Sequence, residues 1–176
     1  MRFNLIVAMC RNNGIGYKGQ LPWKIPQDLH YFSQMTTGDG HNAVIMGHNT
    51  WKSLPIIPGK QPGLRQRDNF ILTSSGIFHE DNNRLKVFKS IEEIEGYLEG
   101  NENYEEVWVI GGAQVYKQFL EQNKIQKCYV TFIDEDFYCD AFFPELDPTV
   151  WKETERRDIY DITYDCKLNY IIYDII

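Results

Sequence analysis

The chain has 176 residues, 43% of them hydrophobic, with 18 basic and 25 acidic side chains and a formal net charge of -7. This length suits one domain that buries roughly 70% of its unfolded surface, and the composition excludes a disordered or fibrous chain. The acidic balance excludes an extended nucleic-acid-binding face, which needs clustered Lys and Arg. Residues 90–116 carry seven acids and no base, so the acidity is concentrated in one patch.

The four cysteines are far apart in the sequence and form neither a C-x-x-C pair nor a zinc-ligand pattern with histidine. This spacing predicts a reduced, cytoplasmic protein without a metal site. The apolar run over residues 5–10 is shorter than the ~20 residues that a membrane span needs. We therefore expect a buried strand there and no membrane association.

Short apolar runs alternate with helical patterns along most of the chain. Runs without inside–outside alternation predict strands that are covered on both faces, and they occupy residues 5–9, 43–46, 70–73, 107–110 and 128–133. Helical patterns cover residues 27–35, 91–98 and 113–122. This order predicts an α/β fold with a mostly parallel sheet and helices on both faces, in one domain over residues 1–176.

The last part of the chain has a different pattern. Residues 151–160 and 167–175 alternate more strongly around a polar stretch, which predicts an antiparallel hairpin at one edge of the sheet. Two long loops rich in Gly and Pro, over residues 11–26 and 54–68, are either binding loops or plain surface excursions.

One carboxylate stands at the head of an apolar helical stripe. Asp28, Tyr31, Phe32 and Met35 follow the i, i+3, i+4, i+7 spacing. The carboxylate either favours the positive end of the helix dipole, or grips a cationic or amidine-like ligand by two hydrogen bonds in an apolar cleft. Spacing alone leaves both interpretations open.

Two glycine turns follow predicted strands and precede helices. Gly47 follows the strand at 43–46, and the Gly111–Gly112 pair follows the strand at 107–110. Such turns let a helix N-terminus approach a phosphate, although a lone glycine turn is more often structural. The G-x-G-x-x-G and P-loop motifs are absent. Two turns in one sheet fit a ligand with two phosphates better than either turn alone.

Taken in order, segments spanning nearly the whole chain resemble dihydrofolate reductases. They are GIG at 14–16, LPWKIPQDL at 21–29, VIMG at 44–47, TWKS at 50–53, PG at 58–59, RDN at 67–69, VIGGAQVY at 109–116, TFID at 131–134, and Asp140 before FP at 143–144. The resemblance implies a three-layer fold with an eight-stranded sheet. It also implies hydride transfer from NADPH to the pterin ring of dihydrofolate, in support of thymidylate, purine and one-carbon metabolism.

The resemblance implies catalytic roles for five residues. Asp28 would grip the pterin and Thr131 would orient it. Leu21 and Trp23 would belong to a mobile loop that covers the reacting rings and admits the water that delivers a proton, and Tyr116 would line the nicotinamide side. The other implied substrate contacts are Ile6, Val7, Ala8, Leu29, Phe32, Leu54, Ile57, Arg67 and Ile110.

Cofactor contacts implied by the resemblance lie at the two glycine turns, on the first loop and at strand ends. Gly111–Gly112 resembles a peptide bond that is cis in this family. The set comprises Ala8, Ile15, Gly16, Leu21, Gly47, His48, Asn49, Thr50, Leu72, Thr73, Ser74, Ser75, Lys89, Ile110, Gly111, Gly112, Ala113, Gln114, Val115 and Tyr116.

Two positions in the resemblance are argued separately. Arg67, two residues before Asn69, matches the family arginine whose guanidinium suits a carboxylate of the folate tail, so residues 60–66 would be an insertion and Arg65 a weaker alternative. Where the family usually reads the adenosine 2′-phosphate with a basic residue, this chain has His48. Because a free histidine titrates near ~6.5, we expect His48 to favour NADPH over NADH only when it is protonated.

Three functions therefore remain in view. The first is a monomeric NADPH-dependent dihydrofolate reductase without a fused thymidylate synthase. The second is a related pyrimidine reductase of riboflavin synthesis, against which Asp28 and Arg67 argue. The third is a non-catalytic nucleotide- or folate-binding protein that retains the scaffold.

Overall fold

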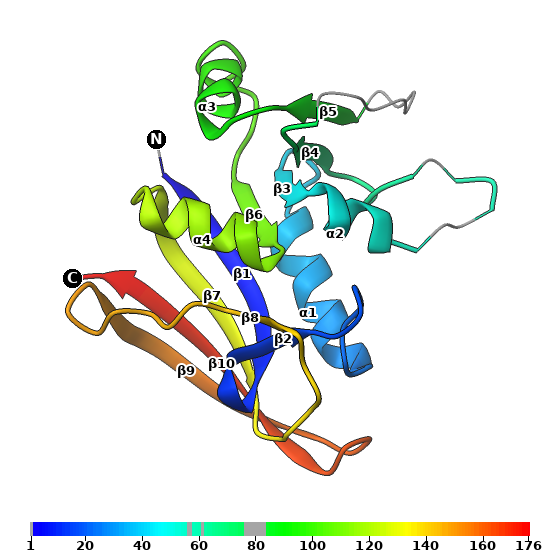
Figure 1. The fold of residues 1–176 in the computed structure, drawn as a ribbon, viewed down its shortest axis with the longest axis vertical. Helices are drawn as coiled ribbons and strands as arrows, with labels where there is room; N and C mark the ends of the chain where they lie inside the picture. Colours follow the sequence, from blue (N-terminus) through cyan, green and yellow to red (C-terminus); the bar gives the residue numbers. More distant parts are fainter. Residues whose placement is uncertain (1, 56–57, 61, 76–83) are drawn as a thin grey trace.

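The chain folds around a sheet whose apolar strands are covered by helices (Figure 1). The computed structural model describes residues 2–55, 58–60, 62–75 and 84–176. The strands are β1 (Phe3–Cys10), β2 (Gly14–Gly16), β3 (Ala43–Gly47), β4 (Asp68–Leu72), β5 (Leu85–Phe88), β6 (Val107–Gly111), β7 (Ile125–Ile133), β8 (Ala141–Phe142), β9 (Trp151–Asp161) and β10 (Cys166–Ile175). The helices are η1 (Arg11–Asn13), α1 (Pro26–Thr37), α2 (His48–Ser53), α3 (Ile91–Glu99) and α4 (Ala113–Glu121).

The main sheet has eight strands in the order β5-β4-β3-β6-β1-β7-β10-β9. Strands β1 and β3 to β7 run parallel, whereas β10 runs antiparallel to both β7 and β9. The predicted eight-stranded, mostly parallel sheet with a C-terminal antiparallel hairpin is confirmed. Parallel strands place their carboxyl ends at one edge of a sheet, where ligands of such folds bind.

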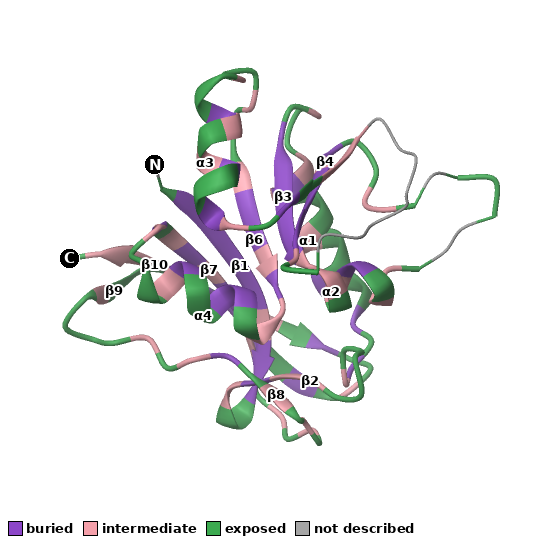
Figure 2. Cartoon of the chain, turned by 45° about the horizontal axis from the view of Figure 1, so that its top comes forward, coloured by how far each residue is buried: buried purple, intermediate pink, exposed green. Residues whose placement is uncertain are grey.

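Alternate residues of the central strands pack into two separate apolar layers. Phe3 and Leu5 of β1 belong to the layer under α3 and α4, where the Phe3 and Phe119 rings meet edge to face at 5.4 Å. Ile6 of β1 and Val44 of β3 belong to the opposite layer, under α1 and α2. Helices therefore cover both faces, and the buried strands run through the middle of the domain (Figure 2).

Three strands lie outside the predicted elements. β5 has only four residues and three of them are partly or fully exposed, so it lacks the continuous apolar run that marks the central strands. β2 and β8 have three and two residues and form their own sheet. Their pairing joins segments more than 120 residues apart, which short-range pattern does not reveal. α1 also begins one residue earlier than predicted, because Pro26 suits the first turn of a helix.

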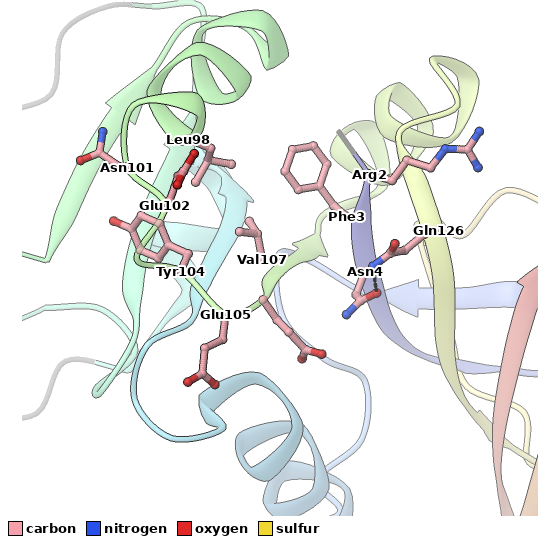
Figure 3. A pocket seen from close by; sticks show the side chains of 11 residues that line it. Arg2, Phe3, Asn4, Leu98, Asn101, Glu102, Tyr104, Glu105, Val107 and Gln126 are labelled. Atoms are coloured by element: carbon pink, nitrogen blue, oxygen red, sulfur yellow. Dashed lines mark hydrogen bonds between the residues drawn. The ribbon is translucent and has the colours of Figure 1, made fainter.

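Most of the acidic patch lies at the amino edge of the parallel strands, whereas its first acids, at the start of α3, lie near the end of β5, where Glu93 accepts a hydrogen bond from the Lys89 N–H. α3 and the following loop carry these acids to the start of β6, where the Glu105 and Glu106 N–H groups bond the His41 carbonyl and the Asn42 side chain. A pocket of about 390 Å³ opens there. Figure 3 shows Tyr104 on one wall and the hydrogen-bonded Asn4–Gln126 pair on the other. This pocket is at the opposite edge from the predicted site.

The edge of the main sheet that β9 forms is strongly charged. β9 is the outer strand of the hairpin, and residues 152–158 are all exposed and almost all charged. Arg156 and Glu153 form an ion pair along this strand at 2.7 Å.

Within the described ranges no helix has the length and apolar character to cross a membrane.

Candidate active site

Asp28 is buried in the first turn of α1 with only 7% of its surface exposed. Burial raises the pKa of its carboxyl group to about 6, and a hydrogen bond from Thr131 on β7 acts in the opposite direction. A carboxylate that merely favoured a helix dipole would remain in water at the surface. A buried carboxylate of this kind can offer both oxygens to a ligand in an apolar cleft.

Strand register builds a row of side chains beside Asp28. Thr131 on β7 lies opposite Ala8 on β1 and opposite Tyr170 on β10, and Tyr170 in turn lies opposite Arg157 on β9. The Tyr170 ring packs on Tyr31 of α1 at 4.1 Å between centroids, and the Arg157 guanidinium lies 5.1 Å over the same ring. Residues on one row of a sheet point to the same face.

Tyr170 and Arg157 lie outside the set of predicted site residues, and the sequence identifies Tyr31 only as part of the apolar stripe. Burial raises the pKa of Tyr170, with the nearby Asp28 charge as the second cause. The tyrosine stays neutral, and its ring fixes α1 against β10. The i+3 spacing from Asp28 could have identified Tyr31, but Tyr170 is found only through the β7–β10 register.

The first long loop brings Trp23 into the interior. Its side chain is 5% exposed, and its ring meets Phe137 edge to face at 5.3 Å. The indole N–H is buried and has no acceptor among the described residues. Leu21 and Leu29 are 49% and 47% exposed, so these two residues are not fixed in the apolar core.

The two glycine turns lie side by side at the carboxyl edge of the sheet. A Cβ on Gly47 would come 3.1 Å from Val115 of α4, and one on Gly112 would come 3.5 Å from Thr50 of α2. Gly111 has φ +114 and its bond to Gly112 is cis, as the resemblance implied. Gly47 is the N-cap of α2 and Gly112 is the N-cap of α4, so no side chain caps the start of either helix. This arrangement suits phosphate groups, which bind backbone N–H groups at helix starts.

Tyr116 of α4 links this helix to β1 and β6 at the candidate site. Its hydroxyl lies 2.7 Å from the Ile6 carbonyl and 2.9 Å from the Ile110 carbonyl, and these two acceptors share its one O–H proton. Burial raises the pKa of the phenol, which keeps the donor proton in place. Tyr116 thereby holds β1, β6 and α4 together. Its ring lies so close to Gly111 that a Cβ on this glycine would come within 3.0 Å of it.

Arg67 is buried against the C-terminal part of α1. Its Nε donates to the Arg65 carbonyl, and its Nη1 donates to the Thr36 hydroxyl. Burial, followed by the charge of Arg84, lowers the pKa of Arg67 to about 10. No carboxylate in the described ranges forms an ion pair with it. A buried guanidinium in this state suits an anionic ligand group.

The other predicted cofactor residues are distributed around the carboxyl edge. His48 and Asn49 begin α2, and Leu72 ends β4. Just beyond β4, the hydroxyls of Thr73 and Ser75 lie 3.0 Å apart. The Lys89 N–H donates to Glu93 instead of to a neighbouring strand. The predicted substrate residue Ile57 lies outside the described residues.

A parallel sheet with paired glycine turns and a buried carboxylate at its carboxyl edge is typical of enzymes that bind a dinucleotide and a second small molecule. The sequence profile of the dihydrofolate reductase family matches residues 2–174. A dihydrofolate reductase of Heliothis virescens is 39% identical over 165 residues, covering 90% of this chain and 88% of that protein. One from Aedes albopictus is 41% identical over 153 residues, covering 82% and 80%.

A bifunctional dihydrofolate reductase-thymidylate synthase of Daucus carota is 38% identical over 159 residues, which cover 85% of this chain but 29% of that protein. The similarity therefore falls within one part of the bifunctional protein. The chain belongs to the dihydrofolate reductase family and is an oxidoreductase.

Replacing Asp28 by Asn should stabilise the fold at alkaline pH. The folded-state pKa of about 6 exceeds the reference value of 3.8, so the wild type loses stability as pH rises through this window, and the full penalty is present above it. At pH 8 the variant should gain on the order of 2 to 3 kcal/mol in free energy of unfolding, and near pH 4 almost nothing.

Urea unfolding of both proteins at the two pH values measures this difference. Asp39→Asn, which changes an exposed acid just beyond α1, is the control and should show no comparable gain. An equal gain for Asp28→Asn at pH 4 and pH 8 would contradict the assignment.

Proposed function

We propose that the chain reduces 7,8-dihydrofolate to 5,6,7,8-tetrahydrofolate with NADPH as the hydride donor. The observation that carries this proposal is the buried Asp28 carboxylate with its hydrogen bond from Thr131. A carboxylate in this state binds a flat amino and amide edge through two hydrogen bonds. A cytoplasmic, monomeric enzyme serving thymidylate, purine and one-carbon metabolism is part of the same proposal.

The two ends of α1 support an elongated substrate. Asp28 is in the first turn, and the Arg67 guanidinium bonds Thr36 near the last residue. Residues 28 and 36 are about 12 Å apart along a helix that rises 1.5 Å per residue. The helix thus presents an acid at one end and a buried cation at the other. A ligand with a hydrogen-bonding ring and a distant carboxylate has the matching order of groups.

The paired glycine turns support a diphosphate cofactor. Gly47 and Gly112 leave the helix starts open to close approach, and Thr50 and Ala113 lie in the first turns of α2 and α4. NADPH bound here would supply the hydride. The helix starts at the two glycine turns bind and orient the cofactor. The Tyr116 hydroxyl fixes the backbone of Ile6 and Ile110 beside it.

Asp28 acts electrostatically on the reaction. Above its pKa of about 6 the carboxylate stabilises the positive charge that develops on the ring, and low polarity around it strengthens this effect. Leu21 and Trp23 exclude bulk water on the loop side, while one water supplies the proton. No further protein acid needs to reach the ring nitrogen.

Asp28→Asn should lower turnover of dihydrofolate by about 100-fold at pH 7. Turnover should recover partly near pH 5, where more of the substrate arrives already protonated. Steady-state assays of NADPH oxidation with and without dihydrofolate measure this, and Asp39→Asn serves as the control. Wild-type turnover of Asp28→Asn at pH 7 would refute the mechanism, and an inactive wild type would refute the function.

Arg67→Lys should raise KM for dihydrofolate about 10- to 100-fold, with a much smaller effect on kcat, because one charge-assisted hydrogen bond is lost. The exposed Arg65 offers the matched variant Arg65→Lys, for which KM should stay near the wild-type value. Equal effects of the two substitutions would exclude a specific role for Arg67.

His48 begins α2 next to the two glycine turns, and histidine is the side chain type that gains or loses charge near neutral pH. The affinity for NADPH should therefore weaken by about tenfold between pH 6 and pH 8, while the affinity for NADH changes little. Titrations with each cofactor test this, and His48→Arg should remove the pH dependence. Parallel pH profiles for NADPH and NADH would rule out the role of His48.

A further inference from the structure

Two cysteine thiols lie in contact next to the first long loop. Cys10 is the last residue of β1 and Cys139 precedes β8, and their Sγ atoms are 3.7 Å apart. Cys10 is fully buried, whereas Cys139 is partly exposed. No comparable contact joins any other two of the four cysteines, all of which are described. A disulfide has sulfurs about 2.05 Å apart, so the two sulfurs must move closer together before a bond can form.

The backbone of Gly14 lies close to both sulfurs of the pair. A Cβ on Gly14 would come 2.3 Å from the Cys139 sulfur and 3.0 Å from the Cys10 sulfur. The absence of a side chain at Gly14 therefore leaves room for both thiols. The Asp140 N–H donates to the Gly16 carbonyl at 2.8 Å, directly beside Cys139.

The pair sits where two segments meet. The first long loop, which ends at residue 25 because Pro26 begins α1, carries Leu21 and Trp23, and the strap (residues 134–143) lies against it. Contacts between them include the Arg11 ion pairs with Asp134 and Asp136, the Trp23–Phe137 ring contact and the pairing of β2 with β8. All these links are non-covalent. A bond from Cys10 to Cys139 would tie the loop base to the strap covalently.

We propose that Cys10 and Cys139 form a redox-sensitive dithiol that a small disulfide, such as oxidised glutathione, converts to an intramolecular disulfide. Closure of this bond restrains the first long loop and slows turnover. The site of oxidation is independent of the proposed function, and only the effect on turnover rests on it.

The reaction proceeds by two exchanges. The partly exposed Cys139, as thiolate, attacks one sulfur of oxidised glutathione, forms a mixed disulfide and releases one glutathione thiolate. The Cys10 thiolate then attacks the Cys139 sulfur and releases the second. The two protein thiols lose two electrons and two protons, and these convert one glutathione disulfide to two glutathione thiols.

The surroundings of Cys139 keep it protonated at neutral pH. Burial raises the pKa of this thiol, followed by the contact with Cys10, while Asp140 adds a smaller effect in the same direction and the Gly16 backbone acts against it. Only the thiolate attacks a disulfide. The rate of closure should therefore increase with pH between 7 and 9.

The test equilibrates the whole protein in mixtures of oxidised and reduced glutathione at pH 8 and traps free thiols by alkylation. Trypsin alone leaves Cys128 and Cys139 in one peptide, residues 128–152, so a second cleavage at Asp or Glu between them is needed. Mass spectrometry should identify a peptide pair joined through Cys10 and Cys139, with Cys128 and Cys166 alkylated.

Turnover of the oxidised protein should fall at least threefold and recover after reduction with dithiothreitol. Cys139→Ser should be insensitive to oxidation, whereas Cys166→Ser, which changes a buried thiol of the same apolar cluster, should respond like the wild type. Absence of the linked peptides at equilibrium, or unchanged turnover once the link has formed, would overturn the proposal. Absence of dihydrofolate turnover in the reduced protein refutes the proposed function instead, while the peptide analysis still reports on the site.

Discussion

The burial of one carboxylate is the constraint on which the candidate site depends. Removing Asp28 from water is unfavourable for its charged form, and the structure compensates only in part through Thr131. The position of α1 must therefore be fixed by other contacts. Pro26 starts the helix, and the Tyr31–Tyr170 contact holds it against β10. A charge in an apolar setting interacts strongly with a ligand because little water competes.

The part of the candidate site at the two glycine turns is formed by backbone groups and not by charged side chains. Gly47 and Gly112 let α2 and α4 start next to each other, and the Tyr116 hydroxyl fixes the carbonyls of Ile6 and Ile110 nearby. Most acids of the patch, from Glu99 to Glu106, lie toward the amino edge of the sheet, so they contribute little to the potential at the carboxyl edge. An acidic chain can therefore offer local sites for anions, at helix starts and at Arg67.

Much of the fold follows from short-range pattern, because buried parallel strands such as β3 and β6 are continuous apolar runs. The role proposed for Asp28 rests on family resemblance, since its spacing fits a surface helix end equally well. Tyr170 and Arg157 join the site only through strand register with Thr131. Likewise, the contact between Cys10 and Cys139 depends on segments 129 residues apart. Such long-range relations leave no local periodicity in a sequence.

The exposed outer strand β9 also limits how this sheet can grow. An open sheet edge offers unpaired backbone groups to any other extended chain. Here an incoming strand would have to approach a run of exposed charged side chains, including Glu153, Glu155 and Arg156, and strip water from them. Edge-to-edge association and aggregation through β9 are thereby disfavoured, and the hairpin serves as a barrier as well as a support for Tyr170.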